Sequence, residues 1–504
     1  AGFLYACWRG IMKAMVPVII LLALISLKWT DVLANSSNVL SVDVGTTGVK
    51  VALIDGKTLA QIGPGAYSRY ESGTLARITD GENGYLEQVP EDWYNAFCDA
   101  SKELLSQLNE ELKPCAIVLS GQMQDTIPVS TTDDEALCNA ILYSDSRARL
   151  EAERIEKKFG GPEGMQQLTG LYTGASSVLA KLMWLKKNQK KIYSSCSKVL
   201  LGAHSYVCWR LTGEARCDYT TASTTGLLDV RQWPPVWLEK EMAELGLDSS
   251  KLPELESALQ VTAPLKEKAA KQLGLQPGIP VIHGSGDMGS TSVGAGAGTA
   301  GGAYIYIGTS GWVAVARDGY QPTAAGGFTM LHPDPELCLQ VASMMTAGGN
   351  VEFFLSILGD ALPGKTISEK IQQLDVLAAA SPPGANGVIY LPYIAGERSP
   401  FNDPDIRGGF LGLGVSTRRA DLCRAVLEGV ALAYRHLLEV VGGGAAASAE
   451  ALTVVGGGAR SALWLQILAD ATGRPVAAAA AAGSGGADVA AVGAARMAAA
   501  ALGW

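Results

Sequence analysis

One stretch decides the fold: Val42-Asp43-Val44-Gly45-Thr46-Thr47-Gly48-Val49-Lys50-Val51. On both sides of the Gly-Thr-Thr-Gly turn, valines alternate with polar residues, which predicts a β-hairpin. A glycine turn offers bare N–H groups and the two threonines add hydroxyls, which suits a phosphate group. Asp43, at the end of the first strand, could hold the Mg²⁺ of a nucleotide. An ordinary tight turn is the alternative, and this stretch alone does not separate the two.

The same pattern occurs again at Ile305-Tyr306-Ile307-Gly308-Thr309-Ser310-Gly311-Trp312-Val313. A motif that recurs once at long range predicts two related domains that face each other, rather than a solenoid. The copies differ where Tyr306 takes the place of Asp43, so only the first copy can supply a carboxylate. Two phosphate-binding hairpins with one acid are expected of a cleft that binds a nucleoside triphosphate.

The composition limits the classes of partner. The 504 residues are enough for two or three domains with large cores. A net charge of −9 without a basic stripe argues against a nucleic-acid partner. Nine scattered cysteines without CxxC or Cys/His spacing predict reduced thiols, and argue against a disulfide framework or a zinc site.

Residues 1–38 differ from the rest of the chain. An apolar run at 16–27 has the length of a signal peptide, Lys13 precedes it, and residues 32–34 could form a cleavage site. Two interpretations stay open: a presequence, or a poorly defined N-terminal extension. We leave the segment out of the fold and expect a mature domain that is not embedded in a membrane. The expected location is cytoplasmic or, after removal of a presequence, organellar, such as the plastid.

From residue 39 onward, strand and helix patterns alternate, which predicts an α/β chain with mixed sheets. We expect a first domain over 39–298 and a second over 299–504. The expected helices cover 90–112, 148–159, 176–187 and 420–441, and the expected strands cover 115–120, 140–143, 279–283, 388–393 and 452–455.

Glycine-rich turns follow three of the expected strands, at 45–48, 308–311 and 456–459. The third turn precedes a helix, where backbone N–H groups can bind an anion. Asp287 ends a Gly-Ser-Gly-Asp sequence after an apolar strand, which predicts a carboxylate at the edge of a cleft. Such a group can accept a proton from an attacking hydroxyl even with an ordinary pKa. A turn or helix cap is the alternative role.

With these motifs in place, the chain resembles the FGGY carbohydrate kinases, and most closely their xylulokinase-type members. The resemblance implies two actin-like, ribonuclease-H-like domains with a cleft between them, ATP and Mg²⁺ as cofactors, and a sugar or polyol acceptor. The similarity covers about 39–497, and the matching motifs are Asp43–Lys50, Ser120–Gln124, Ile141–Asp145 with Arg147, Gly284–Asp287, Gly308–Gly311, Gly396–Pro400 and Gly456–Ser461.

The resemblance also implies roles for single residues. Asp287 matches the catalytic base and Asp43 the acid near the metal and the γ-phosphate. The residues that match the phosphate loops and the nucleotide site are Gly45, Thr46, Thr47, Gly308, Thr309, Gly348, Gly457 and Gly458. The residues that match sugar contacts are Met123, Gln124, Asp145 and Met288, together with Asp287 itself. Glu397 and Arg398 match the family signature, where an internal ion pair is as reasonable as contact with the substrate.

Two positions depart from the xylulokinase pattern. Gln124 stands where the family usually has His, and Met288 where it usually has Asn. Methionine makes no strong hydrogen bond to a sugar hydroxyl, and the loss of one such contact can change substrate choice by orders of magnitude. We expect an ATP-dependent kinase for a ketose such as D-xylulose, with another ketose, gluconate or a polyol as alternatives.

A second class of function is a non-catalytic, actin-like nucleotide-binding sensor. The presence of both Asp43 and Asp287 argues against it. For partners we expect a small-molecule sugar and ATP, with a homodimer as the candidate assembly.

Overall fold

The structure, a computed structural model, describes residues 37–79, 83–109, 112–323, 326–358, 364, 366–401, 403, 405–442, 451–479 and 488–504. The apolar run and the cleavage site expected before residue 37 lie outside this range. None of the helices in the described ranges has the length and apolar character needed to cross a membrane.

The first predicted hairpin is confirmed. Strand β1 (Asn38–Val44) pairs antiparallel with β2 (Gly48–Asp55), and Val44 lies opposite Val49. The valines of both strands are buried, which is why the alternation was visible in the sequence. A side chain at Gly48 would place its Cβ 2.3 Å from the Ser68 carbonyl oxygen, so the end of the turn requires glycine.

A six-stranded sheet forms around this hairpin in the order β15-β16-β6-β1-β2-β3. Strand β6 is parallel to β1, and β16 is parallel to β6. The further strands of the sheet are β3 (Ala66–Arg69), β6 (Ala116–Gly121), β15 (Ala263–Pro264) and β16 (Pro280–Gly286).

The second hairpin is confirmed as well, and it forms the centre of a second six-stranded sheet in the order β19-β20-β18-β17-β23-β24. Its strands are β17 (Ala303–Ile307), β18 (Gly311–Asp318), β19 (Phe328–Leu331), β20 (Leu337–Met344), β23 (Leu452–Val455) and β24 (Val476–Ala478). Five strands of each sheet follow one plan: β3-β2-β1-β6-β16 in the first and β20-β18-β17-β23-β24 in the second. In both, three antiparallel strands are followed by two parallel ones, so the repeat extends from the turns to the whole sheet.

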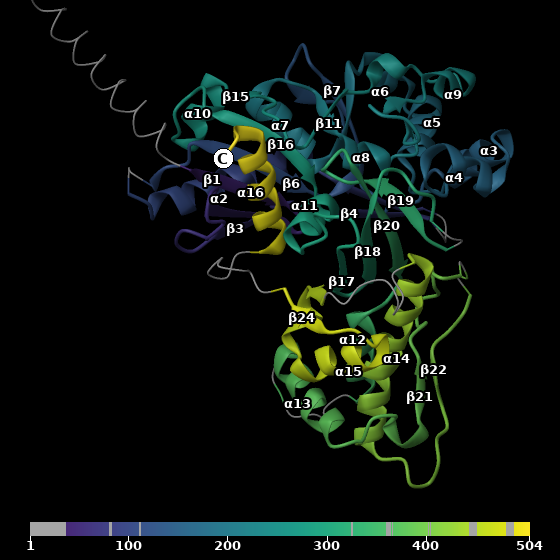
Figure 1. Ribbon diagram of the computed structural model, residues 1–504. Coiled ribbons are helices and arrows are strands. Elements are labelled where there is room, and N and C mark those ends of the chain that lie inside the picture. Colours follow the sequence, from purple (N-terminus) through teal and green to yellow (C-terminus); the bar gives the residue numbers. More distant parts are fainter. Residues whose placement is uncertain are drawn as a thin grey trace, which may run out of the picture.

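Helices pack on both sheets (Figure 1). One face of the first sheet packs on α2 (Pro90–Ser106) and α7 (Ala203–Thr212), which contribute Trp93 and Trp209 to the core. The second sheet packs on α14 (Arg419–Val440) and its neighbours. Those neighbours are α12 (Gly348–Leu358), α13 (Ile367–Ala379) and α15 (Ala462–Thr472).

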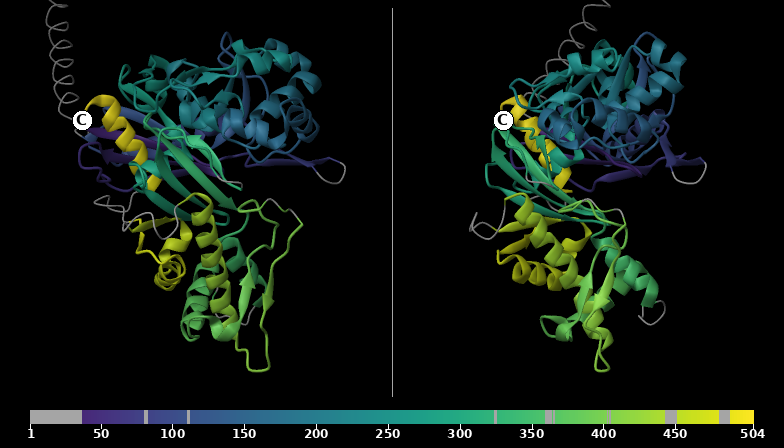
Figure 2. Two further views of the ribbon diagram at one scale, coloured as in Figure 1. Left: turned by 45° about the vertical axis from the view of Figure 1, so that its right-hand side comes forward. Right: turned by 90° about the vertical axis from the view of Figure 1, so that its right-hand side faces the viewer.

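Two helices cross between the sheets, α11 (Asp287–Gly294) and α16 (Val489–Leu502). A Cβ at Gly294 would lie 2.0 Å from the Val489 carbonyl oxygen, and one at Gly493 would lie 1.9 Å from that of Ser290. The crossing therefore needs glycine on both helices. Although α16 comes last in the sequence, it packs on strands β1, β6 and β16, and it lies beside the first sheet in all views (Figures 1 and 2).

A smaller part of the first half is built from the sheet β10-β7-β9-β5-β4, with β8 paired to β7, and from short helices. Its strands are β4 (Leu75–Thr79), β5 (Asn83–Gln88), β7 (Met123–Ser130), β8 (Glu135–Ala136), β9 (Ala140–Ile141) and β10 (Lys198–Gly202). Its helices and short strand pairs are α3 (Arg149–Lys158), α4 (Gly161–Thr169), α5 (Val178–Asn188), α6 (Lys190–Ser195), α8 (Tyr219–Ser223), α9 (Glu239–Glu244), β11 (Arg216–Asp218) with β14 (Glu254–Glu256), and β12 (Leu228–Asp229) with β13 (Val236–Trp237). Helix α10 (Glu267–Leu273) instead packs in the core of the first sheet, and the pair β21 (Ile389–Leu391) and β22 (Gly409–Leu411) packs in the core of the second.

Some expected elements are shorter than their sequence patterns. The helix expected over 90–112 ends at Ser106, where the chain enters turns ahead of Pro114. The strand expected over 140–143 is only β9, because the backbone N–H of Tyr143 donates to the Asp125 carboxylate instead of to a neighbouring strand. Side chains that compete for backbone groups are not visible in a hydrophobic pattern.

Candidate active site

The two predicted acids lie at the same edge of the first sheet. Asp43 is near the end of β1, and Asp287 directly follows β16 as the first residue of α11. Strand β6 lies between them, with Ser120 beside Asp43 and Gly121 beside Gly286. The carboxyl ends of parallel strands form the usual ligand-binding edge of such a sheet.

Asp43 sits in a strongly acidic environment. Its Oδ1 is buried and has no hydrogen-bond partner among the residues that the structure describes. Burial, and then the charges of Asp488 and Asp287, raise its pKa to about 7, against the opposing effect of Lys50 and His204. Asp488 caps the N-terminus of α16 and pairs with Lys50 at 2.8 Å. A hard cation would bind a carboxylate oxygen that is buried without a hydrogen-bond partner and lies near other acidic side chains. The residues around Asp43 therefore fit a Mg²⁺ site.

Asp287 is suited to accept a proton. Its side chain is exposed, while the surrounding protein still desolvates it and raises its pKa to about 6. The Met288 N–H, 2.7 Å from Asp287 Oδ1, and the charge of His204 oppose this rise. Solvent on one side and protein on the others is the setting expected on the wall of a cleft. A carboxylate with a pKa close to neutrality is an effective general base.

The second hairpin faces the same region. Tyr306, which stands where the first hairpin has Asp43, stacks on Trp312 with ring centroids 3.8 Å apart and an interplanar angle of 9°. Burial raises the pKa of Tyr306, and the charges of Asp287 and Asp488 raise it further. The structure therefore brings the end of β17, the end of β1 and Asp287 within electrostatic reach of one another.

Glycine segments meet at the end of β17. Gly348 N–H donates to the Gly308 carbonyl at 2.8 Å, and Gly349 N–H to that of Thr309 at 3.0 Å. A Cβ at Gly348 would lie 2.6 Å from the Gly308 oxygen, and one at Gly458 would lie 2.5 Å from the Ile307 side chain. The predicted segments 308–311, 348–349 and 456–458 are thus packed into one backbone cradle. Gly457 begins a single 3₁₀ turn (Gly457–Arg460), and α15 follows it.

The first turn is held by tyrosines. The Tyr70 hydroxyl donates to the Gly45 carbonyl at 2.5 Å, and the Thr47 hydroxyl lies 3.1 Å from that of Tyr67. The side chains of Thr46 and Thr47 are exposed, and Thr309 in the second turn is exposed as well. Both turns therefore present hydroxyls to solvent.

The residues predicted to contact the sugar divide into two groups. Gln124 is partly exposed, and its backbone has a φ of 63°, which is unusual for a residue other than glycine. Its Nε2 donates to the Thr224 carbonyl at 3.0 Å. Met123 and Met288 instead pack in an apolar cluster with residues of the second sheet, such as Tyr304.

Asp145, the fourth predicted sugar contact, is fully buried. Its carboxylate accepts hydrogen bonds from the Leu86 N–H at 2.6 Å and from Arg147 Nη2 at 2.7 Å. Arg147 in turn lies over the Tyr85 ring at 4.0 Å. The oxygens of Asp145 are therefore occupied by hydrogen bonds inside the protein. Sequence reasoning did not detect the hydrogen bond from Leu86, because Leu86 lies on a distant strand, β5.

Glu397 and Arg398 do not form the ion pair suggested by the sequence. Glu397 is buried, and its Oε1 accepts hydrogen bonds from the N–H groups of Met345 at 2.9 Å and of Arg398 at 2.7 Å. The carboxylate therefore fastens the signature turn to the backbone that leads into Gly348. Burial raises the pKa of Glu397.

Several buried charges near the site were not found from the sequence. The Lys181 ammonium donates to the carbonyls of Leu142 at 2.6 Å and of Gln124 at 3.3 Å, and so helps hold the backbone of Gln124. Burial lowers the pKa of Lys181 to about 8 and raises that of Asp125. Neither residue belongs to a recognisable motif, and only the packing of α5 on β7 brings them together.

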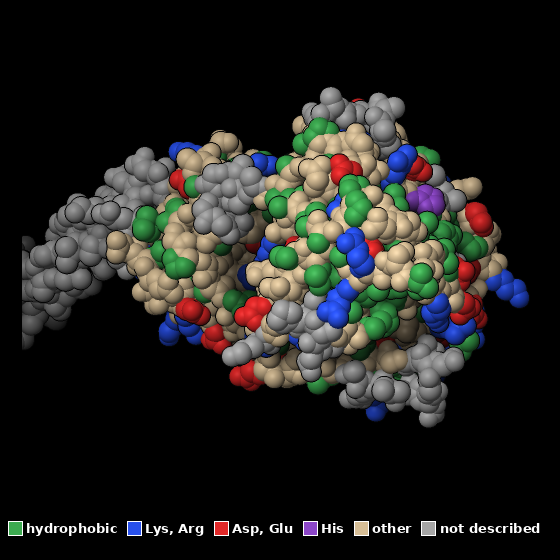
Figure 3. All heavy atoms as spheres, turned by 90° about the horizontal axis from the view of Figure 1, so that it is seen from below, with side chains coloured by type: hydrophobic (Ala, Val, Ile, Leu, Met, Phe, Trp, Pro, Cys, Tyr) green, Lys and Arg blue, Asp and Glu red, His purple; other side chains and the backbone are tan. Residues whose placement is uncertain are grey.

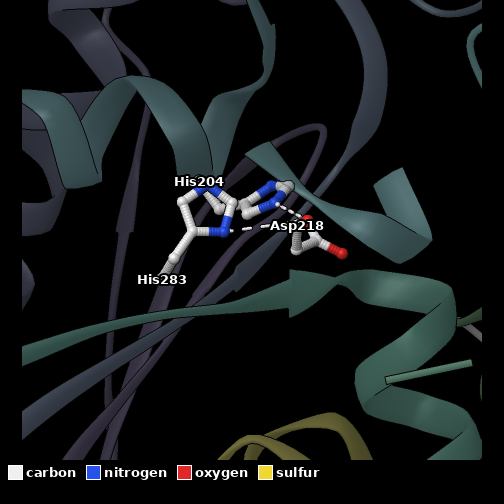
Figure 4. A group of neighbouring side chains, drawn as sticks. All are labelled: His204, Asp218 and His283. Atoms are coloured by element: carbon white, nitrogen blue, oxygen red, sulfur yellow. Dashed lines mark hydrogen bonds and ion pairs between the residues drawn. The ribbon is translucent and has the colours of Figure 1, made fainter. Parts of the chain in front are cut away.

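A second such group consists of His204, Asp218 and His283 (Figure 4). Their donor types would suit a metal ion. However, His204 Nε2 already donates to Asp218 Oδ2 at 3.2 Å, and the other carboxylate oxygen accepts two further hydrogen bonds. Both oxygens of Asp218 are therefore occupied by hydrogen bonds within the protein, whereas the Nδ1 atoms of His204 and His283 are buried without a hydrogen-bond partner among the described residues.

The duplicated sheet, the paired glycine hairpins and the acids at the strand ends define the class of actin-like ATPase folds. Seen from below, a recess separates the two parts of the molecule (Figure 3). The chain belongs to the FGGY family of carbohydrate kinases: the N-terminal domain model of that family matches residues 38–294, and the C-terminal domain model matches residues 303–502.

Similar proteins agree with this assignment. The chain is 30% identical to the xylulose kinase of Escherichia coli (strain K12), over 86% of this chain and 85% of that protein. It is 27% identical to the gluconokinase of Bacillus subtilis (strain 168), over 78% of this chain and 75% of that protein. The crystal structure of a xyloylose kinase from Brucella ovis superimposes with a TM-score of 0.80 at 31% identity, over 92% and 90% of the two chains. The protein is thus a sugar kinase of xylulokinase-like type, a phosphotransferase for which the family implies ATP binding.

Proposed function

We propose that the protein transfers the γ-phosphoryl group of Mg-ATP to a hydroxyl of a ketose such as D-xylulose, with Asp287 as the general base. The observation that carries the proposal is the position of Asp287. It lies at the edge shared by β1 and β16, within electrostatic reach of both hairpins, and its pKa is raised to about 6.

In the proposed step, the acceptor oxygen forms a bond to the γ-phosphorus while the bond from phosphorus to the ADP oxygen breaks. The hydroxyl proton passes to the Asp287 carboxylate. The turns at 45–48 and 308–311 orient the phosphates through backbone N–H groups and the hydroxyls of Thr46, Thr47 and Thr309. Asp43 would hold Mg²⁺, which, when bound, offsets charge on the phosphates.

The identity of the acceptor depends on a few side chains. Met288 packs into the apolar cluster and leaves no polar group at its position, whereas Gln124 is partly exposed with its amide nitrogen already bound to Thr224. We therefore assign the choice of acceptor chiefly to Gln124. Another ketose, gluconate or a polyol are the alternative acceptors, and the presence of a gluconokinase among the relatives favours including gluconate.

The non-catalytic sensor is less well supported, because Asp43 and Asp287 are both retained and face the same space. The homodimer and the cytoplasmic or plastid location stay predictions from the sequence.

The proposal is tested by measuring ADP release with a panel of acceptors: D-xylulose, D-ribulose, D-fructose, gluconate, glycerol and xylitol. We expect one ketose to raise ADP release well above the rate without an acceptor, and the sugar phosphate to form in equal amount. Binding of ATP without turnover on any acceptor would instead identify the sensor. Preference for gluconate or a polyol would retain the kinase and overturn the ketose assignment.

A further inference from the structure

A buried network lies behind the strand end that carries Asp287. His204 is in the first turn of α7, Asp218 caps α8, and His283 is in β16 (Figure 4). All three side chains are shielded from solvent. The side chain of His204 fits closely against two glycines: a Cβ at Gly121 would lie 3.2 Å from His204 Cβ, and one at Gly202 would lie 2.7 Å from the His204 ring.

Asp218 is the hub of this network. Its Oδ1 accepts hydrogen bonds from the Thr221 N–H at 3.0 Å and from the Ser285 hydroxyl at 3.1 Å. Its Oδ2 accepts from His204 Nε2 at 3.2 Å and lies 3.7 Å from His283 Nδ1. Burial alone would raise the pKa of Asp218, but the hydrogen bond and charge of His204 outweigh it and lower the pKa to about 2. Asp218 is therefore an ionised carboxylate with both oxygens engaged.

Ser285 connects the hub to the catalytic position, two residues before Asp287. Its carbonyl accepts a hydrogen bond from the Ser290 hydroxyl at 3.1 Å, so strand end and helix start are tied to each other. Gly284 has a φ of 67°, and a Cβ at Gly286 would lie 2.0 Å from Met123 Sδ. The connection from β16 to α11, which directs the Asp287 side chain, is therefore held on one side by the hydrogen bond from Ser285 to Asp218 and confined on the other by Met123.

The network also contributes charge. His204 lowers the pKa of both Asp43 and Asp287, and it opposes protonation of the neighbouring His283, whose pKa burial lowers to about 4. The charged and titratable groups that face Asp287 come from four elements: Asp43 on β1, Asp125 on β7, His204 on α7, and Tyr304 and Tyr306 on β17. The cap residue Asp488 acts on Asp43.

We propose that His204 and Asp218 are positioning residues for phosphoryl transfer: through Ser285 they fix the direction of the Asp287 carboxylate, and the His204 imidazole keeps it available as a base. This inference rests on the proposed function, because it assigns the network to the residue proposed as the base. A purely structural network would stabilise the fold without affecting Asp287.

The first test is Ser285→Ala, which removes only the hydroxyl that links Asp218 to the connection from β16 to α11. We expect kcat to fall about 10- to 100-fold, because a small misplacement of a catalytic group is costly, while the KM values for ATP and the sugar change less than about threefold. Ser101→Ala is the matched control: Ser101 is also fully buried, in α2, and its hydroxyl has no partner. It should retain full kcat.

The second test is His204→Gln, which keeps a hydrogen-bond donor and removes the imidazole. We expect a similar loss of kcat and an upward shift, by about half a pH unit or more, of the pH at which kcat/KM falls on the acid side. Ser285→Ala should leave that pH unchanged. His332→Gln, at a buried histidine of the second half, is the control and should match the wild type in both measurements.

Wild-type kcat in folded Ser285→Ala, or an unshifted acid limb in folded His204→Gln, would overturn the inference. If His204→Gln does not fold, the Ser285→Ala result decides. The outcome is separable from the proposed function. If Asp287→Asn is inactive while both network variants behave as the wild type, the base assignment stands and only the positioning role is wrong.

Discussion

The two hairpins of this kinase share a strand order and a turn, yet they differ in chemistry. The first, β1–β2, ends in Asp43, whose pKa is raised by burial and by neighbouring acids. The second, β17–β18, has Tyr306 at that place, stacked on Trp312, and the end of β17 and its turn are packed against Gly458 and Gly348. The comparison teaches that two sheets with the same strand order can take on different chemistry through one substitution, here Asp43 in the first hairpin and Tyr306 in the second. In the proposed function, the first hairpin would supply charge for a cation and the second would supply a backbone cradle for phosphates.

The largest effect is expected when the charge of the first hairpin is removed. Asp43→Asn should lower kcat by about 10²- to 10³-fold, because it removes the carboxylate that would hold Mg²⁺. Tyr306→Phe at the equivalent place keeps the ring stack and should change kcat by about twofold or less. Steady-state kinetics at saturating Mg²⁺ measures both. Equal losses of kcat in the two variants would contradict the assignment of different roles to the two hairpins.

An intermediate effect is expected in the cradle of the second hairpin. Gly348→Ala places a Cβ 2.6 Å from the Gly308 carbonyl oxygen, so the turn must move, and the KM for ATP should rise about tenfold. Gly45→Ala meets only the Gly48 oxygen, at 3.4 Å, and should raise this KM less than threefold. Titration of ATP at saturating sugar measures both constants. A larger rise of the KM for ATP in Gly45→Ala than in Gly348→Ala would contradict the assignment of the phosphate cradle to the second hairpin.

A smaller effect is expected from pH. Asp287 must be deprotonated to act as a base, and its pKa is raised to about 6. As the pH falls through this value the protonated, inactive fraction grows, so kcat/KM should be about tenfold lower at pH 5 than on its plateau. A pH–rate profile at constant ionic strength and saturating Mg²⁺ measures this. A flat profile between pH 5 and 8 would contradict the role of Asp287.

Much of this arrangement could be predicted from the sequence, because its signals are local. Alternating valines, glycine turns and acids that follow apolar strands define both hairpins and place Asp43 and Asp287 at strand ends. The family assignment followed from the same motifs. The boundaries of short strands were less predictable, since side chains such as Asp125 compete for backbone N–H groups.

The remaining part depends on contacts between distant segments. Asp488 reaches the site only because α16 returns to the first sheet, and its partner Lys50 is 438 residues earlier in the chain. Met288 was expected to face the sugar, but the packing of α11 against the second sheet turns it into an apolar cluster. Asp145 was expected to do the same, yet it is buried beside Arg147. Such outcomes are decided by tertiary packing, which no local pattern reports.

The most direct test of the account measures phosphoryl transfer and ATP affinity together in Asp287→Asn. This change keeps the shape of the side chain and removes the base. The account predicts that transfer from γ-labelled ATP to the preferred sugar falls by about 10³-fold or more while the Kd for ATP stays within about threefold of the wild type. Asp99→Asn, at an exposed aspartate of α2, should match the wild type in both measurements. Retention of most of the transfer rate in Asp287→Asn would contradict the central claim.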